Sequence, residues 1–95
     1  MRAMREEQQP PDRRCTPLGK AAGQAFLEAG LACEKSPSFH SGHEAYAVIL
    51  EELDEFWIEV KANRYATCRA ELMQVVAMCL RAMAELYPDP EEPVS

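Results

Sequence analysis

No apolar run in the sequence approaches the roughly 20 residues that a membrane-spanning helix needs, so we expect no membrane segment. The opening stretch, MRAMREEQQPPDRR, mixes charges of both signs and has no apolar centre, unlike a signal peptide. None of the four cysteines forms a C-x-x-C pair, which argues against a zinc knuckle or a redox motif. These absences predict a cytoplasmic protein with free thiols, in which Cys33 and Cys79 pack as small core residues.

Lysine and arginine are also scarce, and neither occurs from residue 36 through residue 60. The 95 residues carry 10 Lys and Arg against 16 Asp and Glu, a net charge of −6. Duplex nucleic acid is excluded as a partner, because its binding depends on neutralising phosphates with Lys and Arg. The length fits a single domain, and the hydrophobic fraction of 47% is ordinary for a folded soluble protein.

The chain shows neither an internal repeat nor the alternating pattern of a β-strand, so we expect an all-α fold. Residues 1–15 are polar and are expected to form a flexible N-terminal arm. Residues 88–95 hold three prolines and three acids and are expected to form a disordered tail. The helical domain is therefore expected over residues 16–87.

Capping signals divide this domain into three helices. Thr16 is the expected N-cap of the first, because its hydroxyl can accept a bond from a free backbone N–H and proline follows it. Ser41 and Glu44 have the spacing of a capping box at the start of the second. Asn63 is the expected cap of the third. The first two helices are predicted over residues 16–35 and 41–61, and the third is predicted to begin within residues 63–71 and to end near Tyr87.

Two surfaces predict how these helices pack. At about 100° per residue, Gly19, Gly23 and Gly30 share one side of the first helix, and we expect a neighbouring helix to approach this glycine face closely. The third helix has an apolar arc of roughly 200°, about twice what a surface helix needs. Because two other helices cannot cover it, a homodimer or a dimer of dimers is expected to complete the bundle. The arc comprises Leu72, Met73, Val75, Val76, Ala77, Cys79, Leu80, Met83, Ala84 and Leu86.

The second helix carries six acids between His43 and Lys61 with no base among them. Like charges three or four residues apart on a helix destabilise it by a few tenths of a kcal/mol each, unless solvent screens them or a cation binds. An antiparallel third helix would bring Glu71 close to Glu52 and Glu55, with Gln74 one turn further on. Carboxylate and amide oxygens are the ligands that Mg²⁺ prefers, so a metal site stands as the alternative to a solvated acidic face.

The same residues resemble a split motif, E-E-x-x-E followed on the next helix by E-x-x-D. The first half is Glu51-Glu52-Leu53-Asp54-Glu55, and after fifteen residues the second half is Glu71-Leu72-Met73-Gln74. The motif, together with the surrounding residues 18–87, is similar to the MazG-like and dimeric dUTPase group of all-α nucleoside triphosphate pyrophosphohydrolases. The resemblance implies a MazG-like helical bundle of three main helices per chain, completed by homodimerisation.

The resemblance also implies an activity and its residues. Members of this group hydrolyse the α–β phosphate bond of (deoxy)nucleoside triphosphates to the monophosphate and pyrophosphate, a reaction associated with nucleotide house-cleaning. Glu52, Glu55 and Glu71, with Gln74, would bind Mg²⁺, or Mn²⁺ as the alternative ion. Glu51 would act beside Glu52 at the catalytic centre by positioning or deprotonating the attacking water.

Some observations leave the function open. Gln74 stands where the motif has Asp, so a catalytically impaired helical oligomer with a metal, nucleotide or structural role is the alternative. An acidic adaptor for a basic protein is a third hypothesis. Lys61, Arg64 and Arg81 are weaker candidates for phosphate contacts, since exposed bases are common and Arg81 has Glu85 four residues on as a possible ion-pair partner. The pattern does not specify which base or sugar is bound.

Overall fold

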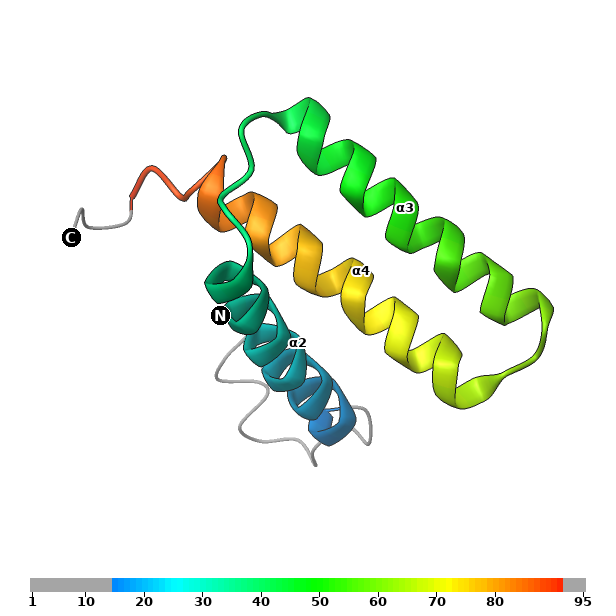
Figure 1. The fold of residues 1–95 in the computed structure, drawn as a ribbon. Helices are drawn as coiled ribbons and strands as arrows, with labels where there is room; N and C mark the ends of the chain where they lie inside the picture. Colours follow the sequence, from blue (N-terminus) through cyan, green and yellow to red (C-terminus); the bar gives the residue numbers. More distant parts are fainter. Residues whose placement is uncertain (1–14, 92–95) are drawn as a thin grey trace.

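The computed structural model describes residues 15–91, and no strand occurs in that range. This confirms the predicted all-α class. Of the predicted terminal segments, residues 1–14 and 92–95 lie outside the described residues. None of the described helices is both long and apolar enough to cross a membrane. The helices are α2 (Cys15–Lys35), α3 (Gly42–Lys61) and α4 (Tyr65–Glu85) (Figure 1).

The start of α3 is the boundary that the sequence predicted best. Ser41 is the N-cap, and its hydroxyl accepts a hydrogen bond from the backbone N–H of Glu44 at 3.2 Å. The second half of the capping box differs from the prediction, because the Glu44 carboxylate accepts the N–H of His40 at 2.6 Å. The side chains of these two residues still satisfy free N–H groups at the helix entrance, which fixes where α3 begins.

The other two predicted caps are wrong. Thr16 lies inside the first turn of α2, which begins at Cys15. Asn63 precedes the actual N-cap of α4, Arg64, and has a φ of 58°. Asparagine tolerates this left-handed conformation better than most residues, so Asn63 shapes the turn between α3 and α4 instead of capping a helix. Helix α4 ends at Glu85, two residues before the predicted Tyr87.

Helix α4 lies in the middle of the fold and packs against both other helices, whereas no Cα atom of α2 comes within 8 Å of α3. In Figure 1, α3 and α4 run antiparallel side by side, and α2 lies on the other side of α4. The main core cluster contains Ala29, Phe39, Ala45, Ala77, Met78 and Ala82. Alanine lets helices approach closely but buries little apolar area, so this core stabilises the fold less than one built from Leu and Ile.

The inward face of α4 combines part of the apolar arc, Met73 and Ala77, with residues from outside the arc. The buried residues include Met78 and Arg81, which lie on the narrow polar side of the helix. Residues in the apolar arc remain exposed, with Leu72 at 44%, Val76 at 42% and Met83 at 61%. The polar side is buried because α4 must face α2 and α3 at once, and much of the apolar arc is left facing outward.

The predicted close packing of the glycine face is also wrong for the single chain. A Cβ atom added at Gly19, Gly23 or Gly30 would meet nothing within 4 Å. Helix α2 instead packs through its alanines, with Ala25 and Ala29 buried. The cysteine prediction is partly wrong as well: all four described cysteines are free thiols, but Cys33 is exposed and Cys79 only half-buried.

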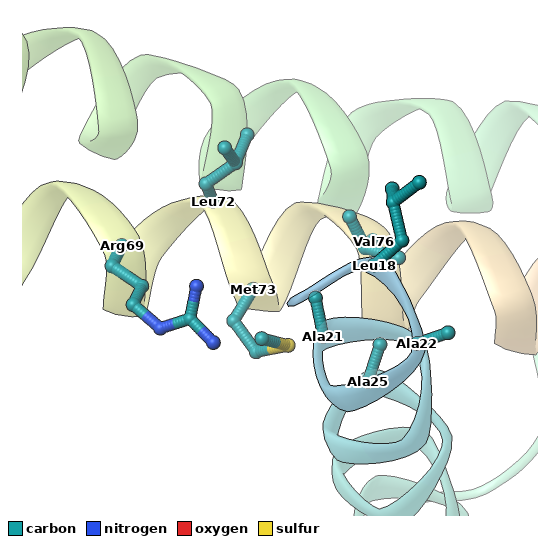
Figure 2. A pocket seen from close by; sticks show the side chains of 8 residues that line it. All are labelled: Leu18, Ala21, Ala22, Ala25, Arg69, Leu72, Met73 and Val76. Atoms are coloured by element: carbon teal, nitrogen blue, oxygen red, sulfur yellow. The ribbon is translucent and has the colours of Figure 1, made fainter. Parts of the chain in front are cut away.

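Three of the exposed apolar side chains, Leu18, Leu72 and Val76, line an apolar groove of about 250 Å³ between α2 and α4 (Figure 2). Arg69 contributes the only charged side chain among its lining residues. A second hollow beside it is lined by Phe56, Tyr65 and Cys68 and shares Leu72 and Arg69 with the groove. Together they extend one apolar surface from α2 across α4 to α3. The groove is lined by Leu18, Ala21, Ala22, Ala25, Arg69, Leu72, Met73 and Val76.

Candidate metal centre

The turn between α3 and α4 sets the register of the candidate site. Glu55 and Glu71 each lie eight residues from Asn63, so an antiparallel hairpin centred on this turn brings them level. The Glu59 carboxylate fastens the turn by accepting Arg64 Nε at 2.7 Å and Thr67 Oγ1 at 2.6 Å. These contacts hold the first turn of α4 against the last turns of α3 and so fix the carboxylates opposite one another.

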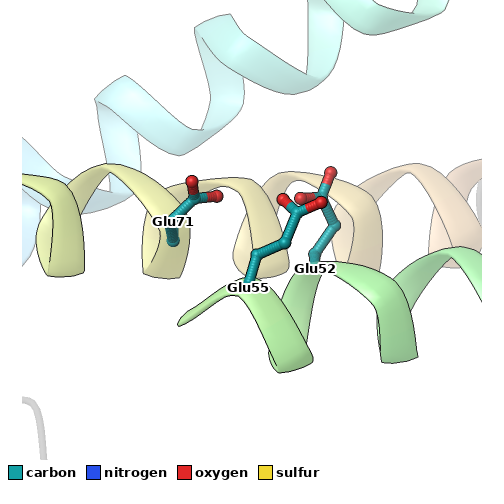
Figure 3. Close-up of side chains that lie close together, drawn as sticks. All are labelled: Glu52, Glu55 and Glu71. Carbon is teal, nitrogen blue, oxygen red and sulfur yellow. The ribbon is translucent and has the colours of Figure 1, made fainter. Parts of the chain in front are cut away.

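The carboxylates of Glu52 and Glu55 from α3 and Glu71 from α4 form a cluster (Figure 3). One oxygen from each lies within 4.8 Å of the others. Glu52 and Glu71 are half-buried, and Glu55 is exposed. This carboxylate cluster is the arrangement that the antiparallel hairpin predicted.

Burial and the neighbouring carboxylates disfavour the charged forms of Glu52 and Glu71. Burial, followed by the hydrogen bond with Glu55 and the charges of Glu55 and Glu71, raises the pKa of Glu52 to about 7. Burial and the charge of Glu55 likewise raise the pKa of Glu71. Glu52 therefore holds a proton for much of the time near neutral pH unless a cation balances the cluster.

The donor set and spacing fit a small hard cation. Oxygens around an octahedral Mg²⁺ lie about 2.1 Å from the ion, and hence about 3 to 4 Å from one another. Modest rotations of the three side chains would bring oxygens spaced by 4.8 Å or less onto one ion. Mg²⁺ usually keeps several waters, so three protein oxygens are enough to hold it and leave positions for a phosphate.

Gln74, the fourth predicted ligand, has another partner. Its amide nitrogen donates to Oε1 of Glu28 in α2 at 3.2 Å. This bond ties Gln74 to α2. Sequence reasoning missed Glu28, because nothing in the sequence indicates which residue of α2 faces α4 at this level.

The remaining predicted residues are dispersed. Glu51 is exposed, and its charge contributes to the raised pKa of Glu52, so it lies beside the cluster. The Lys61 ammonium sits 5.5 Å from the centre of the Trp57 ring. Arg64 is paired with Glu59 at the turn.

Arg81 differs from the other predicted phosphate ligands because it is buried, at 5% exposure. It forms an ion pair with Glu85, its Nε lying 3.1 Å from Oε2. Arg81 therefore serves an internal ion pair instead of standing as a free cation for a phosphate.

A cavity of about 380 Å³ opens beside Glu52 and runs between α3, α4 and the connection from α2 to α3. Its volume falls within the range of small-molecule sites, roughly 300 to 1,000 Å³. Apolar and polar groups both line it, which suits a ligand with a flat apolar part and polar edges. The lining residues are Ala32, Ser36, Pro37, Ser38, Phe39, Glu44, Val48, Glu52, Met78 and Arg81.

A scan against protein-family models, a search of curated proteins and a search of solved structures each find no match to this chain.

Without metal, the protein is expected to lose stability as the pH rises from about 5 to 8. The pKa of Glu52 is near 4.5 in the unfolded chain and about 7 in the fold, so the folded state binds more protons across this window. The stabilisation is complete below the unfolded pKa and is lost as the pH rises through the folded pKa. Melting curves at several pH values, with and without Mg²⁺, measure this loss of stability. In Glu52→Gln, the stability of the metal-free protein should depend less on pH. A stability that rises over this window would contradict the assignment.

Gln74→Asp is expected to lower the stability of the metal-free protein by about 1 kcal/mol, because it replaces a donor to Glu28 with a second negative charge. Mg²⁺ affinity should rise by roughly tenfold if position 74 reaches the ion, since affinity follows ligand charge. Calorimetric titration measures the second effect. The control is Gln24→Asp, which adds the same charge at an exposed position of α2. If Gln74→Asp and the wild-type protein bind Mg²⁺ with equal affinity, residue 74 is not a metal ligand.

Proposed function

We propose that the protein is a Mg²⁺-dependent nucleoside triphosphate pyrophosphohydrolase that converts an NTP or dNTP to the monophosphate and pyrophosphate. The observation that carries this proposal is the convergence of Glu52, Glu55 and Glu71 from two antiparallel helices into one cluster. These are the acids that the resemblance to MazG-like proteins assigns to metal binding. A solvated acidic face has no need to gather charges from two helices against their mutual repulsion.

Each side chain has a role that follows from its position. Glu52, Glu55 and Glu71 would hold the ion, which when bound neutralises negative charge on the phosphates. Glu51, exposed next to the cluster, would orient the attacking water and accept its proton. By holding the ion in place, the carboxylate cluster would keep the reacting phosphate in line with this water, and correct positioning is a large part of catalysis of phosphate transfer.

The cavity beside Glu52 is the place we propose for the base and sugar. A triphosphate held at the carboxylate cluster would leave its nucleoside within reach of this cavity, because Glu52 belongs to both. Val48, Met78 and Phe39 offer apolar contacts for a base, and Ser36 and Ser38 offer hydroxyl groups to its edges or to the sugar.

A second copy of the chain is proposed to cover the apolar surface between α2, α4 and α3. Exposed residues of this surface, such as Leu18 at 66%, make it too apolar to face water in a stable monomer. The core, which is built largely of alanines, also favours association, because a small domain with little buried apolar area gains stability from a partner.

Leu72→Glu is expected to dissociate this assembly, because Leu72 lines both the groove and the neighbouring hollow. A charge buried at the centre of an interface should weaken it by at least about 100-fold. Light scattering on a dilution series measures the change. Ala70→Glu, on an exposed position of the same helix, is the control. A wild-type protein that is monomeric at high concentration would contradict the proposed homodimer.

The proposed activity is tested by pyrophosphate release from a panel of NTPs and dNTPs, with and without Mg²⁺. Metal-dependent release from at least one nucleotide is the expected result. If no nucleotide of the panel releases pyrophosphate with Mg²⁺ or Mn²⁺, the proposed pyrophosphohydrolase activity is excluded.

The second candidate is a helical oligomer that binds metal or nucleotide without hydrolysis. The observation in its favour is Gln74, which stands where the motif has Asp and is bonded to Glu28. It predicts a melting temperature that rises with Mg²⁺ in the absence of any turnover. An acidic adaptor for a basic partner would show neither effect.

A further inference from the structure

The connection from α2 to α3, residues 36–41, forms one side of the cavity beside Glu52. It has no regular secondary structure of its own apart from the caps of the two helices. The position of this segment therefore depends on contacts with the rest of the fold, and those contacts decide the shape of the cavity.

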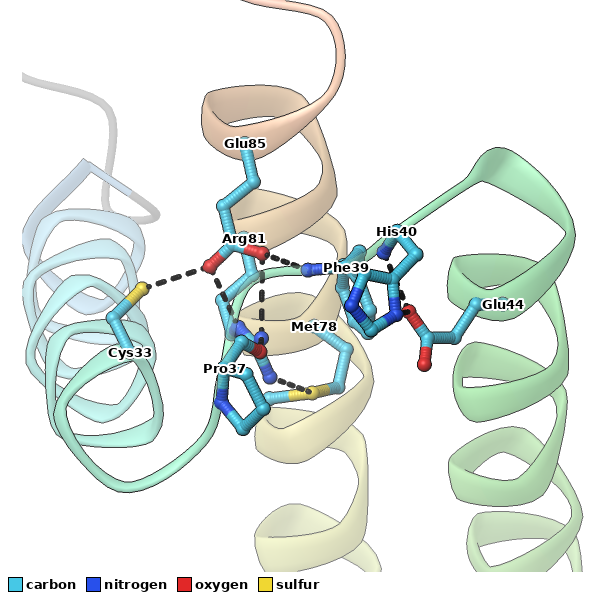
Figure 4. Close-up of polar contacts among 8 residues, drawn as sticks. All are labelled: Cys33, Pro37, Phe39, His40, Glu44, Met78, Arg81 and Glu85. Carbon is cyan, nitrogen blue, oxygen red and sulfur yellow. Dashed lines mark hydrogen bonds and ion pairs between the residues drawn. The ribbon is translucent and has the colours of Figure 1, made fainter.

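The central part of the connection is held by one pair of side chains from α4 (Figure 4). Oε1 of Glu85 accepts the backbone N–H of Phe39 at 2.8 Å. Arg81 Nη2 donates to the carbonyl oxygen of Pro37 at 3.0 Å. The guanidinium also stacks on the Phe39 ring, 4.3 Å from its centre. Phe39 is buried, so this side of the cavity is fastened at three points to Arg81 and Glu85.

The pair is itself fully engaged. Nε and Nη2 of Arg81 donate to Glu85 at 3.1 and 3.3 Å, and Nη1 lies 3.8 Å from the Met78 sulfur. Glu85 also accepts the Cys33 thiol at 3.2 Å. Nε and Nη2 of Arg81 are thus engaged inside the protein, and Arg81, which also lines the cavity, holds the Pro37 and Phe39 side of it in place.

We infer that Arg81 and Glu85 are positioning residues, which hold the Pro37–Phe39 side of the cavity at the distance from Glu52 that a nucleoside requires. This inference rests on the proposed function. Positioning residues of this kind affect substrate affinity, because they shape the part of the site that binds the nucleoside. It leaves the carboxylate cluster unchanged, so metal affinity and the chemical step should be spared.

The test substitution is Arg81→Lys, and its matched control is Arg69→Lys. Lysine at position 81 keeps the positive charge but loses the planar stack on Phe39 and the simultaneous bonds to Pro37 and Glu85. We expect KM for the preferred nucleotide to rise about tenfold, while kcat and Mg²⁺ affinity stay within about twofold. Arg69 lies on the same helix, outside the cavity, and bonds Gln24 of α2, so Arg69→Lys should leave KM unchanged.

Two further variants keep the test decisive if Arg81→Lys folds poorly. Glu85→Gln keeps an oxygen to accept the Phe39 N–H but removes the charge that holds Arg81. Phe39→Leu removes the stacking partner and leaves the ion pair in place. Both should raise KM, and the effects of Arg81→Lys and Phe39→Leu should be non-additive in the double variant, because they break one contact. All assays are run below the melting transition of every variant.

The outcomes separate the two proposals. Raised KM with unchanged kcat and metal affinity supports the positioning role. Lower melting temperatures with unchanged KM, or a fall in kcat alone, would overturn the inference and leave the proposed enzyme intact. Absence of pyrophosphate release from the wild-type protein would overturn the proposed function and this inference with it.

Discussion

Glu52→Gln is expected to reduce Mg²⁺-dependent pyrophosphate release by at least about 100-fold, the scale on which removal of one strong electrostatic group lowers enzyme rates. Glu52 has the largest expected effect because it belongs to both the carboxylate cluster and the nucleoside cavity. The same change should raise the melting temperature of the metal-free protein, since it removes a half-buried acid from beside Glu55 and Glu71. Loss of activity in a more stable protein cannot be explained by unfolding.

The control for this prediction is Asp54→Asn, which removes one exposed carboxylate from the same helix outside the cluster. It should retain near wild-type activity and the full rise of melting temperature with Mg²⁺. Activity that survives in Glu52→Gln, or that falls equally in both variants, would show that the cluster is not the catalytic metal site.

Arg81→Met is expected to destabilise the protein by about 3–5 kcal/mol, the cost of breaking a buried ion pair by removing one partner. The side chains of Arg81 and Glu85 are only 5% and 10% exposed, so water compensates poorly for the lost contact. Arg81 is the first cause of the lowered pKa of Glu85, and without it this carboxylate would be buried without its counter-charge. For a domain of this size the loss corresponds to a fall in melting temperature of roughly 15–30 °C. Urea or thermal unfolding measures it.

The double variant Arg81→Met, Glu85→Gln separates charge from packing. It leaves no buried charge, and glutamine can still accept the Phe39 N–H, so at least half of the lost stability should return. If the double variant is as unstable as Arg81→Met, the effect comes from lost packing of Arg81 on Phe39. The predicted role of the ion pair would then be wrong.

The local chemistry of the chain was sufficient to predict the helices. The Ser41 cap depends on one hydroxyl and an N–H three residues away, so it could be predicted from neighbouring residues alone. The Thr16 and Asn63 caps failed because a preference for capping does not fix the backbone conformation. Thr16 is helical, and Asn63 adopts a φ of 58° in the turn before the actual N-cap, Arg64.

The carboxylate cluster could also be predicted, because it depends on a short hairpin. A turn of a few residues forces α3 and α4 to run antiparallel, and residues at equal distances from it then meet. Glu55 and Glu71 satisfy that condition. Gln74 could not be assigned in this way, since its partner Glu28 belongs to a helix that the hairpin does not include.

By itself the sequence determined the all-α class, the extent of the three helices and the meeting of three acids, because each depends on contacts between residues close in the chain. Only the tertiary structure decided which side of α4 is buried. A helix packed on two sides takes its inner face from both neighbours, and this one buries Arg81 while leaving Leu72 exposed. The bonds by which Arg81 and Glu85 hold Pro37 and Phe39 join residues more than forty positions apart, and no local pattern specifies these contacts.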